Sequence, residues 1–219
     1  MTSPPPGPER GADGGPGHYF TTDPAARSRL RSLSLALPDG IALDLTTDSG
    51  VFSADRVDPG TRALLAEGPP VRGTTLLDLG CGYGPIACAL ARRAGPDATV
   101  WAIDVNRRAL GLCARNAEAN GVGDRVRVAE PADVPSDVRF DQIWSNPPIR
   151  VGKAMLHQLL SDWLGRLAAG GEALLVVQKH LGADSLARWL DEAGWPTERL
   201  GSRMGYRLLR SVPASGATT

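Results

Sequence analysis

Apolar and polar residues alternate on both sides of a turn sequence near the start of the chain. The alternation runs through Leu33–Leu37 and again through Ile41–Leu45, with Asp39-Gly40 between the two segments. A period of two around an Asp-Gly dipeptide predicts a β-hairpin. A short helix is predicted over Asp58–Ala66, because Asp58 suits the N-cap and the proline after it suits the first helical turn. Together these segments predict an N-terminal cap over residues 18–72.

After Gly73 the pattern changes to short apolar segments that alternate with amphipathic ones. The predicted strands are Thr75–Leu79, Thr99–Asp104, Arg125–Val128, Phe140–Ser145, Glu172–Gln178 and Tyr206–Leu209. The predicted helices are Pro85–Arg93, Asn106–Asn120, Lys153–Leu167 with Gly170-Gly171 at its end, and Asp184–Ala193. Strands and helices that alternate in this way indicate an α/β fold, with a mostly parallel sheet and helices on both faces. Residues 73–211 form the predicted main domain.

Length and composition favour one domain with two loose ends. The chain has 219 residues, of which 42% are hydrophobic and 22% charged, enough for one packed core. Residues 1–17 contain five prolines and five glycines, which predicts a disordered leader. We predict a flexible tail over residues 212–219.

Charge and cysteine content narrow the class of protein. Lys plus Arg and Asp plus Glu both number 24, so nothing in the net charge indicates a nucleic-acid partner, although a local basic face stays open. The apolar stretches are too short to cross a membrane, and the leader lacks the apolar core of a secretory signal. The three cysteines form no C-x-x-C pair and the three histidines are scattered, so we expect neither a disulfide scaffold nor a metal site. A reducing cytoplasm is the expected compartment.

The first candidate site is the glycine-rich segment Asp78–Gly84, between a predicted buried strand and a predicted helix. Its glycines allow a tight turn and a close approach of the backbone to a ligand, although a plain structural turn is the alternative. Their spacing is Gly-x-Gly-x-Gly rather than the Gly-x-Gly-x-x-Gly of dinucleotide sites. The carboxylate of Asp78 would repel a pyrophosphate and attract a cationic ligand.

The second candidate is Asp104, at the end of the next predicted strand. An acid at this point of a βαβ unit accepts hydrogen bonds from the ribose hydroxyls of a nucleoside cofactor. Helix capping beside Asn106 is the alternative. Together Asp78 and Asp104 favour a nucleoside of positive charge, and S-adenosyl-L-methionine fits, because it carries a sulfonium and an amino group.

The third candidate is Ser145-Asn146-Pro147-Pro148, which closes the fourth strand of the main domain. Two prolines remove two backbone donors and fix two φ angles, so the loop is rigid and rich in acceptors. The side-chain oxygen of Asn146 and the carbonyl of Pro147 suit a substrate –NH2 group. Two acceptors on the amine hydrogens would aim the nitrogen lone pair at a methyl donor. A loop stiffened only for structural reasons is the alternative.

In this order, Asp78–Gly84, Asp104 and Asn146–Pro148 resemble the motifs of Rossmann-like, S-adenosylmethionine-dependent amino methyltransferases. More narrowly, the chain resembles the small-subunit ribosomal RNA guanine-N2 methyltransferases over about His18–Ser211. Further stretches that resemble this family are His18-Tyr19-Phe20, Asp48–Ser53, Val57–Thr61, Gly182-Ala183 and Gly205–Arg207.

The resemblance implies a fold, a cofactor and a set of site residues. It implies a doubly wound seven-stranded sheet with the last strand antiparallel, and a methyltransferase domain over residues 73–211. The implied catalytic residues are Asn146, Pro147 and Pro148. The implied cofactor-binding residues are Asp78, Gly80, Cys81, Gly82, Gly84, Asp104, Val105, Asp133, Asn146 and Phe52. For Phe52, an ordinary position in the core is the alternative.

Three positions depart from the family pattern. Ile149 follows the two prolines where an aromatic residue is usual, so it would pack on a base less specifically. The acid that holds the adenine amino group is Glu130 or Asp133, and we favour Asp133. Some relatives carry a second, degenerate methyltransferase-like half, whereas this chain has a short cap. We therefore expect a monomer or a homodimer that holds RNA in a different way.

Basic residues gather after the motifs that end the predicted strands. Only two of the 24 basic residues are lysines, and arginine holds phosphates in a bidentate manner. A solvated face is the alternative for each cluster. The residues expected to bind the RNA substrate are Ile149, Arg150, Lys153, Lys179, Arg203 and Arg207.

These features predict methyl transfer from S-adenosyl-L-methionine to the N2 amine of a guanine in ribosomal RNA, with 16S rRNA or an assembling small subunit as partner. One alternative is an amino methyltransferase that acts on a protein glutamine or on DNA adenine. Another is a noncatalytic, cofactor-sensing RNA-binding module. A dinucleotide-dependent reductase is disfavoured by the glycine spacing.

Overall fold

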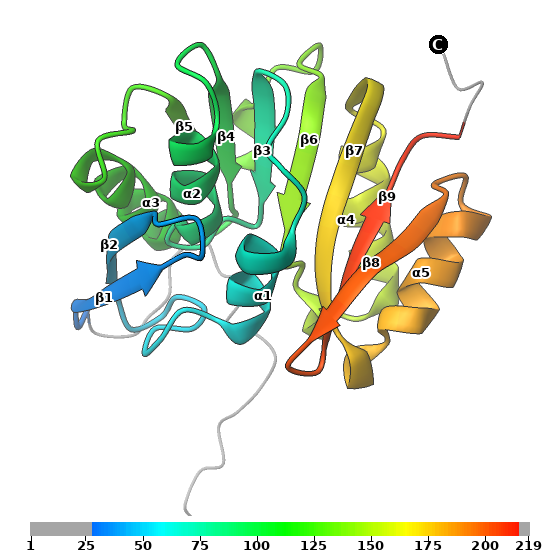
Figure 1. Cartoon of the computed structure of the whole chain (residues 1–219), viewed down its shortest axis with the longest axis horizontal. Coiled ribbons are helices and arrows are strands. Elements are labelled where there is room, and N and C mark those ends of the chain that lie inside the picture. The colour runs from blue at the N-terminus through cyan, green and yellow to red at the C-terminus, as the bar shows by residue number, and fades with distance from the viewer. Residues whose placement is uncertain (1–27, 215–219) are drawn as a thin grey trace, which may run out of the picture.

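The computed structural model of the chain describes residues 28–214 (Figure 1). The predicted leader over 1–17, the first part of the predicted cap (18–27) and the end of the predicted tail (215–219) lie outside the described residues. Within the described part, helices cover both faces of a seven-stranded sheet, and a separate two-stranded sheet lies beside it. In that same part, none of the helices is long and apolar enough to cross a membrane.

The seven strands have the order β5-β4-β3-β6-β7-β9-β8. Their bounds are β3 Thr75–Leu79, β4 Thr99–Ile103, β5 Val126–Ala129, β6 Phe140–Ser145, β7 Leu167–Gln178, β8 Thr197–Arg203 and β9 Tyr206–Ser211. Neighbours from β5 to β7 are parallel, and β9 is antiparallel to both β7 and β8. The predicted Rossmann-like fold with a reversed last strand is thus confirmed. Because the strand order reverses between β3 and β6, the loops that leave these two strands diverge and leave room for a ligand between them.

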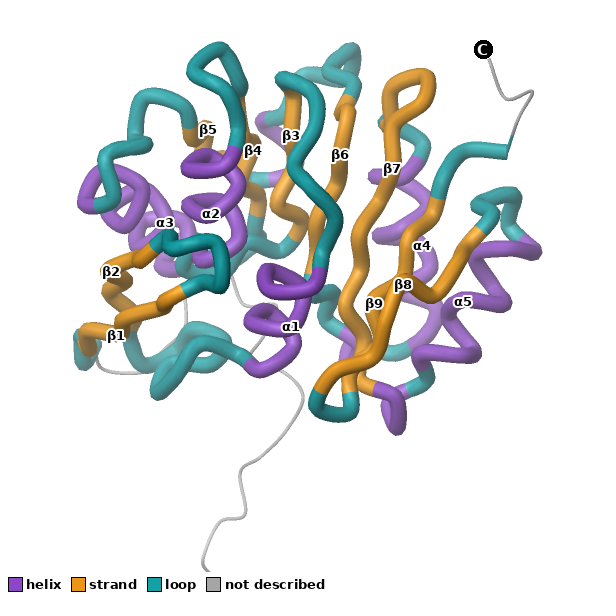
Figure 2. Tube along the Cα trace, viewed as in Figure 1, coloured by secondary structure: helices purple, strands orange, loops and turns teal. Residues whose placement is uncertain are grey.

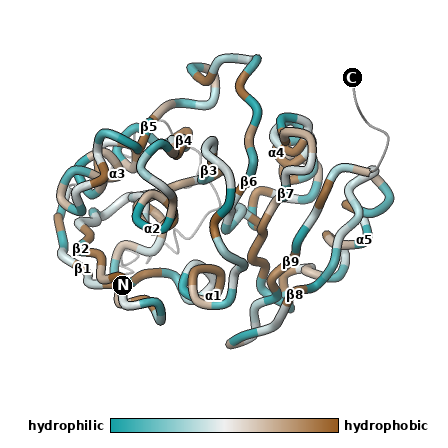
Figure 3. The backbone as a smooth tube through the Cα atoms, turned by 45° about the horizontal axis from the view of Figure 1, so that its top comes forward, coloured by the Kyte–Doolittle hydropathy of each residue, from teal (hydrophilic) through white to brown (hydrophobic). Residues whose placement is uncertain are grey.

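The sheet separates two hydrophobic clusters, and the helices lie on its two faces (Figures 1 and 2). Their bounds are α1 Pro59–Glu67, α2 Pro85–Arg93, α3 Arg107–Ala119, α4 Lys153–Leu164 and α5 Ala183–Glu192. Leu76 and Leu77, neighbours on β3, belong to different clusters because successive side chains point to opposite faces. Helices α1 to α3 cover one face, and α4 and α5 cover the other. Hydrophobic residues gather along β7, which is buried between the two layers (Figure 3).

The end of α4 differs from the sequence prediction. The helix stops at Leu164 rather than Leu167, and Gly170-Gly171 lies within β7 rather than after the helix. Glycine is needed there for a reason of packing: a Cβ added to Gly171 would lie 2.8 Å from the carbonyl oxygen of Phe140. Gly170-Gly171 therefore marks a close approach of two strands. From the sequence alone, such a glycine pair cannot be distinguished from the end of a helix.

The sequence pattern did not predict strand β8. Its side chains are exposed or half-buried along the whole strand, so the sequence Thr197–Arg203 shows no alternation of apolar and polar residues. The strand forms because the edge of β9 offers unpaired backbone groups, and β8 pairs with it in an antiparallel ladder.

The predicted hairpin is confirmed as β1 Arg31–Ala36 paired with β2 Ala42–Thr47. It is held against α3 by side-chain amides rather than by a continuous sheet. Asn116 accepts from the backbone N–H of Thr46 at 2.7 Å and donates to the carbonyls of Thr46 and Tyr83, both at 2.8 Å. One turn later, Asn120 accepts from the N–H of Asp44 and donates to its carbonyl. Two asparagines on one helix face thus take the place of a neighbouring strand.

We expect the replacement Asn116→Ala to lower the free energy of unfolding by about 2–4 kcal/mol, because it leaves three backbone groups without their partner. Urea unfolding measures this loss, and the melting temperature should fall by roughly 5–15 °C. Gln158→Ala is the matched control, because Gln158 bonds only the exposed side chain of Asp162. If both variants lose the same small amount, the asparagines do not hold the hairpin.

Candidate active site

Three loops meet at the carboxyl edge of the sheet, where the strand order reverses. The chain leaves β3 into Gly80–Gly84, leaves β4 at Asp104, and leaves β6 into Asn146-Pro147-Pro148. The three strands are neighbours, so the predicted motifs lie side by side although they span almost seventy residues. Ser145 fixes one of these loops to another, since its hydroxyl donates to the carbonyl of Leu79 at 2.7 Å.

The glycine loop is held by backbone bonds and leaves open space above it. The N–H groups of Gly80 and Cys81 both donate to the carbonyl of Ile103 at 2.9 Å. Gly80 and Gly82 have φ angles of 76° and 54°, and a Cβ added at either position would meet no atom within 4 Å. Gly84 differs, because its added Cβ would lie 2.5 Å from the sulfur of Cys113. Two glycines therefore leave room for a ligand, and the third allows α2 to pack on α3.

Asp78 is a fully buried carboxyl group with one unused oxygen. Its Oδ2 accepts from the N–H of Ala87 at 2.8 Å, whereas Oδ1 has no hydrogen-bond partner among the described residues. Burial raises the pKa of Asp78 to about 8, the bond from Ala87 opposes that rise, and the nearby charge of Asp104 adds to it. A buried acceptor of this kind is suited to a cationic group.

Asp104 joins the glycine loop to the start of α3. Its two oxygens accept from the N–H groups of Gly82 and Asn106, each at 2.9 Å. Each carboxylate oxygen has a second lone pair, so the group can still accept from hydroxyls of a ligand. Burial raises the pKa of Asp104, while the backbone donors oppose that rise. Capping and ligand binding are therefore compatible roles, and Asn106 itself caps α3 through the N–H of Ala109.

The cap reaches this site through the loop that follows β2. Asn106 donates to the carbonyl of Gly50 at 3.1 Å, and Arg108 donates to that of Ser49 at 2.9 Å. Phe52, two residues after Gly50, is 44% exposed, which excludes the alternative of an ordinary core position. Val105, next to Asp104, is 36% exposed.

The Asn146 loop presents acceptors. The amide nitrogen of Asn146 donates to Asp58 Oδ1 at 2.8 Å and to Thr61 Oγ1 at 3.1 Å. Its oxygen accepts no hydrogen bond from the described residues. The carbonyl of Pro147 accepts from the N–H of Ile149 at 2.9 Å and keeps one lone pair. Ile149 begins the short helix η3, Ile149–Val151, and is half-buried.

Of the two acids proposed for the adenine group, Glu130 follows β5 and Asp133 is the last residue of the short helix η2, Pro131–Asp133. Glu130 forms an ion pair with Arg107 at 2.6 Å, whereas Asp133 is exposed. Neither observation decides which acid would hold the adenine amine, so the choice of Asp133 stays a prediction.

The basic residues divide into two groups. Arg150, Lys153 and Lys179 are exposed at the same edge, and within residues 28–214 no carboxylate lies at ion-pair distance from them. Arg203 pairs with Glu67, and Arg207 pairs with Asp184 and is only 14% exposed. The paired arginines already balance charges of the fold, whereas the other three cations have no such ion pair among the described residues.

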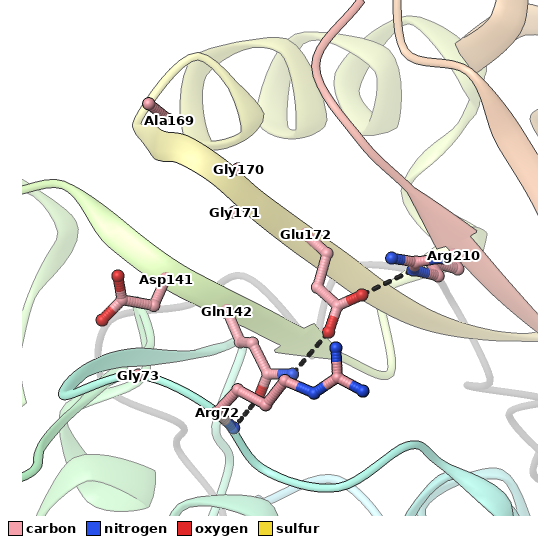
Figure 4. Close-up of a pocket in the computed structure, with 9 residues that line it drawn as sticks. All are labelled: Arg72, Gly73, Asp141, Gln142, Ala169, Gly170, Gly171, Glu172 and Arg210. Atoms are coloured by element: carbon pink, nitrogen blue, oxygen red, sulfur yellow. Dashed lines mark hydrogen bonds and ion pairs between the residues drawn. The ribbon is translucent and has the colours of Figure 1, made fainter.

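A polar cavity lies at the opposite, amino edge of the sheet (Figure 4). Glu172 lies at its centre, where it accepts from Gln142 at 2.6 Å and from Arg210 at 2.5 Å. Gln142 in turn accepts from the backbone N–H of Arg72. These groups satisfy one another and join β6, β7 and β9, so the cavity is part of the scaffold.

Sequence reasoning missed the contacts that bring the cap to the site. Asp58 was identified as a helix cap, and nothing in the residue pattern linked it to Asn146, 88 positions away. Thr61 lay within a stretch that resembled the family but carried no assigned role. The only available signal was that this stretch, Val57–Thr61, matched the family outside the cofactor motifs.

Comparison with known proteins gives three findings. The family model of the methyltransferase small domain matches residues 42–210. The uncharacterized protein YbxB of Bacillus subtilis is 37% identical over 89% of this chain and 97% of its own length. The ribosomal RNA small subunit methyltransferase C of Hahella chejuensis is 40% identical over 83% of this chain and 53% of its own length.

Among solved structures, the T. thermophilus 16S rRNA N2 G1207 methyltransferase (RsmC), in complex with AdoMet and guanosine, has a TM-score of 0.72. It is 28% identical, and the match covers 87% of this chain and 52% of that chain. The chain thus spans about half the length of the named methyltransferases that it matches.

The buried carboxyl group gives a testable dependence of stability on pH. Between the ordinary pKa of 3.8 and the native value of about 8, the folded protein holds one proton more at Asp78 than the unfolded chain. The contribution of Asp78 to stability therefore falls as pH rises through this window and is constant above it. We expect Asp78→Asn to remove that fall, so that the variant gains stability relative to the parent protein between pH 5 and pH 9.

Urea unfolding of both proteins at several pH values measures the difference, in which the other titrating groups cancel. Parallel stability curves for the two proteins would show that Asp78 is ionised in the folded state.

Proposed function

Because the chain belongs to the methyltransferase small domain family, we propose that it transfers a methyl group from S-adenosyl-L-methionine to the exocyclic N2 amine of a guanine in ribosomal RNA. The proposed substrate is 16S rRNA, free or in an assembling small ribosomal subunit. The single observation that carries the proposal is the bonding of Asn146. Its amide nitrogen is bonded to Asp58 and Thr61, so its oxygen is the group left to accept from an amine.

The residues at the carboxyl edge fit the cofactor. The unpartnered oxygen of Asp78 suits its positively charged groups, and the open space above Gly80 and Gly82 admits it close to the backbone. Asp104 keeps lone pairs for the ribose hydroxyls, and Asp133 would accept from the adenine amine. Cys81, Val105 and Phe52 complete the proposed binding set, whereas Gly84 supports it by allowing α2 to pack on α3. When bound, the cofactor supplies an electrophilic methyl group on a sulfonium.

The chain's own residues hold and orient the amine in this mechanism. Asn146 Oδ1 and the Pro147 carbonyl accept from the two amine hydrogens, which turns the nitrogen lone pair toward the methyl group. Pro147 and Pro148 keep these acceptors rigid. A bond forms from nitrogen to the methyl carbon as the sulfur–carbon bond breaks, and the nitrogen gains positive charge. The same acceptors stabilise that charge until a proton leaves to water, so no base is needed before transfer.

Support for an RNA substrate comes from the rim of the site. Arg150, Lys153 and Lys179 are exposed beside the Asn146 loop and its sheet edge, where they would contact phosphates. Ile149 would pack against the base. A guanine that reaches the loop must leave its stack, at a cost of roughly a few kcal/mol. We propose that the chain holds RNA through this rim, as a monomer or homodimer.

The molecule that accepts the methyl group identifies the function. Purified protein and labelled cofactor are incubated with stripped small subunits, naked DNA and a protein with an exposed glutamine. We expect label in the rRNA, and mass spectrometry of the digested RNA should show N2-methylguanine. Label in DNA or protein would identify one of the alternative amino methyltransferases. Cofactor and RNA binding without transfer to any acceptor would favour the noncatalytic module.

Replacement of the catalytic amide is the sharpest test of the mechanism. The contact from Asn146 strengthens toward the transition state, so its loss should raise the barrier rather than weaken binding. We expect Asn146→Ala to slow single-turnover methylation roughly a hundred- to a thousandfold, or about 2.7–4 kcal/mol. Cofactor affinity, measured by calorimetry, should change little. A near-normal rate would reduce the loop to a structural role.

Cofactor affinity should depend on Asp104. A hydrogen bond to a charged group contributes about 1.5–3 kcal/mol, so Asp104→Ala should weaken cofactor binding roughly ten- to more than a hundredfold. Calorimetry measures the change, and Asp97→Ala, which removes an exposed carboxylate from a turn before β4, is the control. Equal affinities for the two variants would remove ribose recognition from Asp104.

A further inference from the structure

We infer that Asp58 and Thr61, at the start of α1, are positioning residues that fix the orientation of the Asn146 amide for methyl transfer. The inference rests on the proposed function and extends it to the N-terminal cap. It assigns a role in the reaction to helix α1, which lies outside the cofactor motifs and carries neither of the groups that accept from the substrate amine.

The orientation of an asparagine amide has two nearly isosteric solutions. With the oxygen toward the substrate, Asn146 accepts from an amine, whereas with the nitrogen toward the substrate, it opposes one donor with another. The side chain of Asp58 decides between the two, because a carboxylate can only accept. The amide nitrogen therefore faces Asp58, and the 2.8 Å bond to Oδ1 holds it there.

Asp58 is itself fixed, which makes it a reliable partner. The same Oδ1 accepts from the backbone N–H groups of Gly60 at 2.7 Å and Thr61 at 3.1 Å, so it caps α1. A rotation away from Asn146 would break the helix cap as well, at a cost of about 1 kcal/mol. The orientation of the amide is thus coupled to the first turn of a helix that packs against β7 and β9.

The second contact comes from Thr61, one of the buried polar residues, at 5% exposure. Its hydroxyl lies 3.1 Å from the same amide nitrogen, so both amide hydrogens have an acceptor on α1. With both hydrogens occupied, the nitrogen has none left for competing partners. Thr61 therefore locks the orientation that Asp58 selects.

The surroundings of Asp58 strengthen its bond to Asn146. Gly60 packs against the ring of Tyr206, since an added Cβ would lie 2.6 Å from Cε1. Burial, followed by the negative charge of Asp58, raises the pKa of both Tyr83 and Tyr206. Two neutral rings thus lie near the half-buried carboxylate, and an apolar surrounding strengthens its electrostatic attraction to the Asn146 amide. A carboxylate on the amide nitrogen also polarises the amide, so that Oδ1 becomes a stronger acceptor as the amine gains positive charge.

The test uses two pairs of variants in the full chain. Thr61→Val removes the hydroxyl and keeps the side-chain shape, and Thr61→Ser restores the hydroxyl. Asp58→Ser keeps a helix cap but is too short to cap α1 and reach Asn146 together, whereas Asp58→Asn keeps an acceptor of the native length. Thr47→Val is the matched control, because Thr47 is a buried threonine of the cap whose hydroxyl has no hydrogen-bond partner within the described residues.

Single-turnover methylation is the main readout. We expect a fall of roughly three- to tenfold in Thr61→Val and of roughly ten- to a hundredfold in Asp58→Ser, as expected for a neutral and a charge-assisted hydrogen bond. Thr61→Ser and Asp58→Asn should each recover part of the rate. Cofactor affinity should stay constant in all four variants and in the Thr47→Val control. A fall in rate that follows the loss of stability in every variant, including the control, would reduce the contacts to a structural role.

The double variant separates positioning from other effects. If Asp58 acts through Asn146, then Asp58→Ser adds no further loss in the Asn146→Ala background, although it slows the parent protein. Additive losses in the two backgrounds would overturn the inference, because Asp58 would then act on the reaction by another route.

The orientation itself is measured without substrate. The side-chain amide resonances of Asn146, assigned by their absence in Asn146→Ala, should shift in Thr61→Val and Asp58→Ser but not in Thr47→Val. Unchanged resonances together with an unchanged methylation rate would overturn the inference and leave the proposed function intact. If the parent protein methylates none of the acceptors, the proposed function is overturned, and with it the role of Asp58 and Thr61 in methyl transfer. The resonances would then decide only whether these two residues orient the Asn146 amide.

Discussion

The N-terminal cap is held on the sheet by asparagine side chains. The chain contains four asparagines, and the amide nitrogen of each donates a hydrogen bond to the cap. The acceptors are the carbonyls of Gly50, Thr46 and Asp44 for Asn106, Asn116 and Asn120, and the side-chain oxygen of Asp58 for Asn146. A two-stranded hairpin has little stability on its own, so the position of the cap depends on these bonds together with the packing of Leu35, Leu43 and Leu45 in the hydrophobic core.

This mode of attachment explains why the cap and the site are one unit. Asparagine both donates and accepts, so a helix that carries it can pair with a strand edge as another strand would. Asn116 also bonds the carbonyl of Tyr83 in the glycine loop, and Asn106 is bonded to Asp104 through its backbone. The groups that hold the cap are therefore the ones that shape the ligand-facing loops. A displacement of the cap would reach those loops directly.

The fold could be predicted from sequence where its signals are local. The turns, the N-caps at Asp58 and Asn106, and the glycine loop after β3 each depend on residues a few positions apart, and the structure confirms them. The exposed edge strand β8 was not predicted, because its pairing with β9, rather than its own residue pattern, makes it a strand. The bond between Asn146 and Asp58 escaped for a related reason, since two polar residues 88 positions apart carry no sign of their contact. The candidate cofactor residues were predictable by motif, whereas the groups that orient them were not.

The bonds of Asn120 also bear on the chemical lifetime of the protein. Asn120 precedes Gly121, and Asn-Gly is the dipeptide that deamidates most readily, because the glycine N–H meets no steric hindrance as it attacks the side-chain carbonyl. Here that side chain is bound to both backbone groups of Asp44, and the Gly121 N–H donates to the carbonyl of Glu118 at 3.0 Å. The docked hairpin thus holds the side chain while the end of α3 holds the N–H, so neither group is free to react. When the cap opens, Asn120 becomes free to deamidate. The resulting aspartate would place a carboxylate oxygen, rather than a donor, against the Asp44 carbonyl and so disfavour the return of the hairpin.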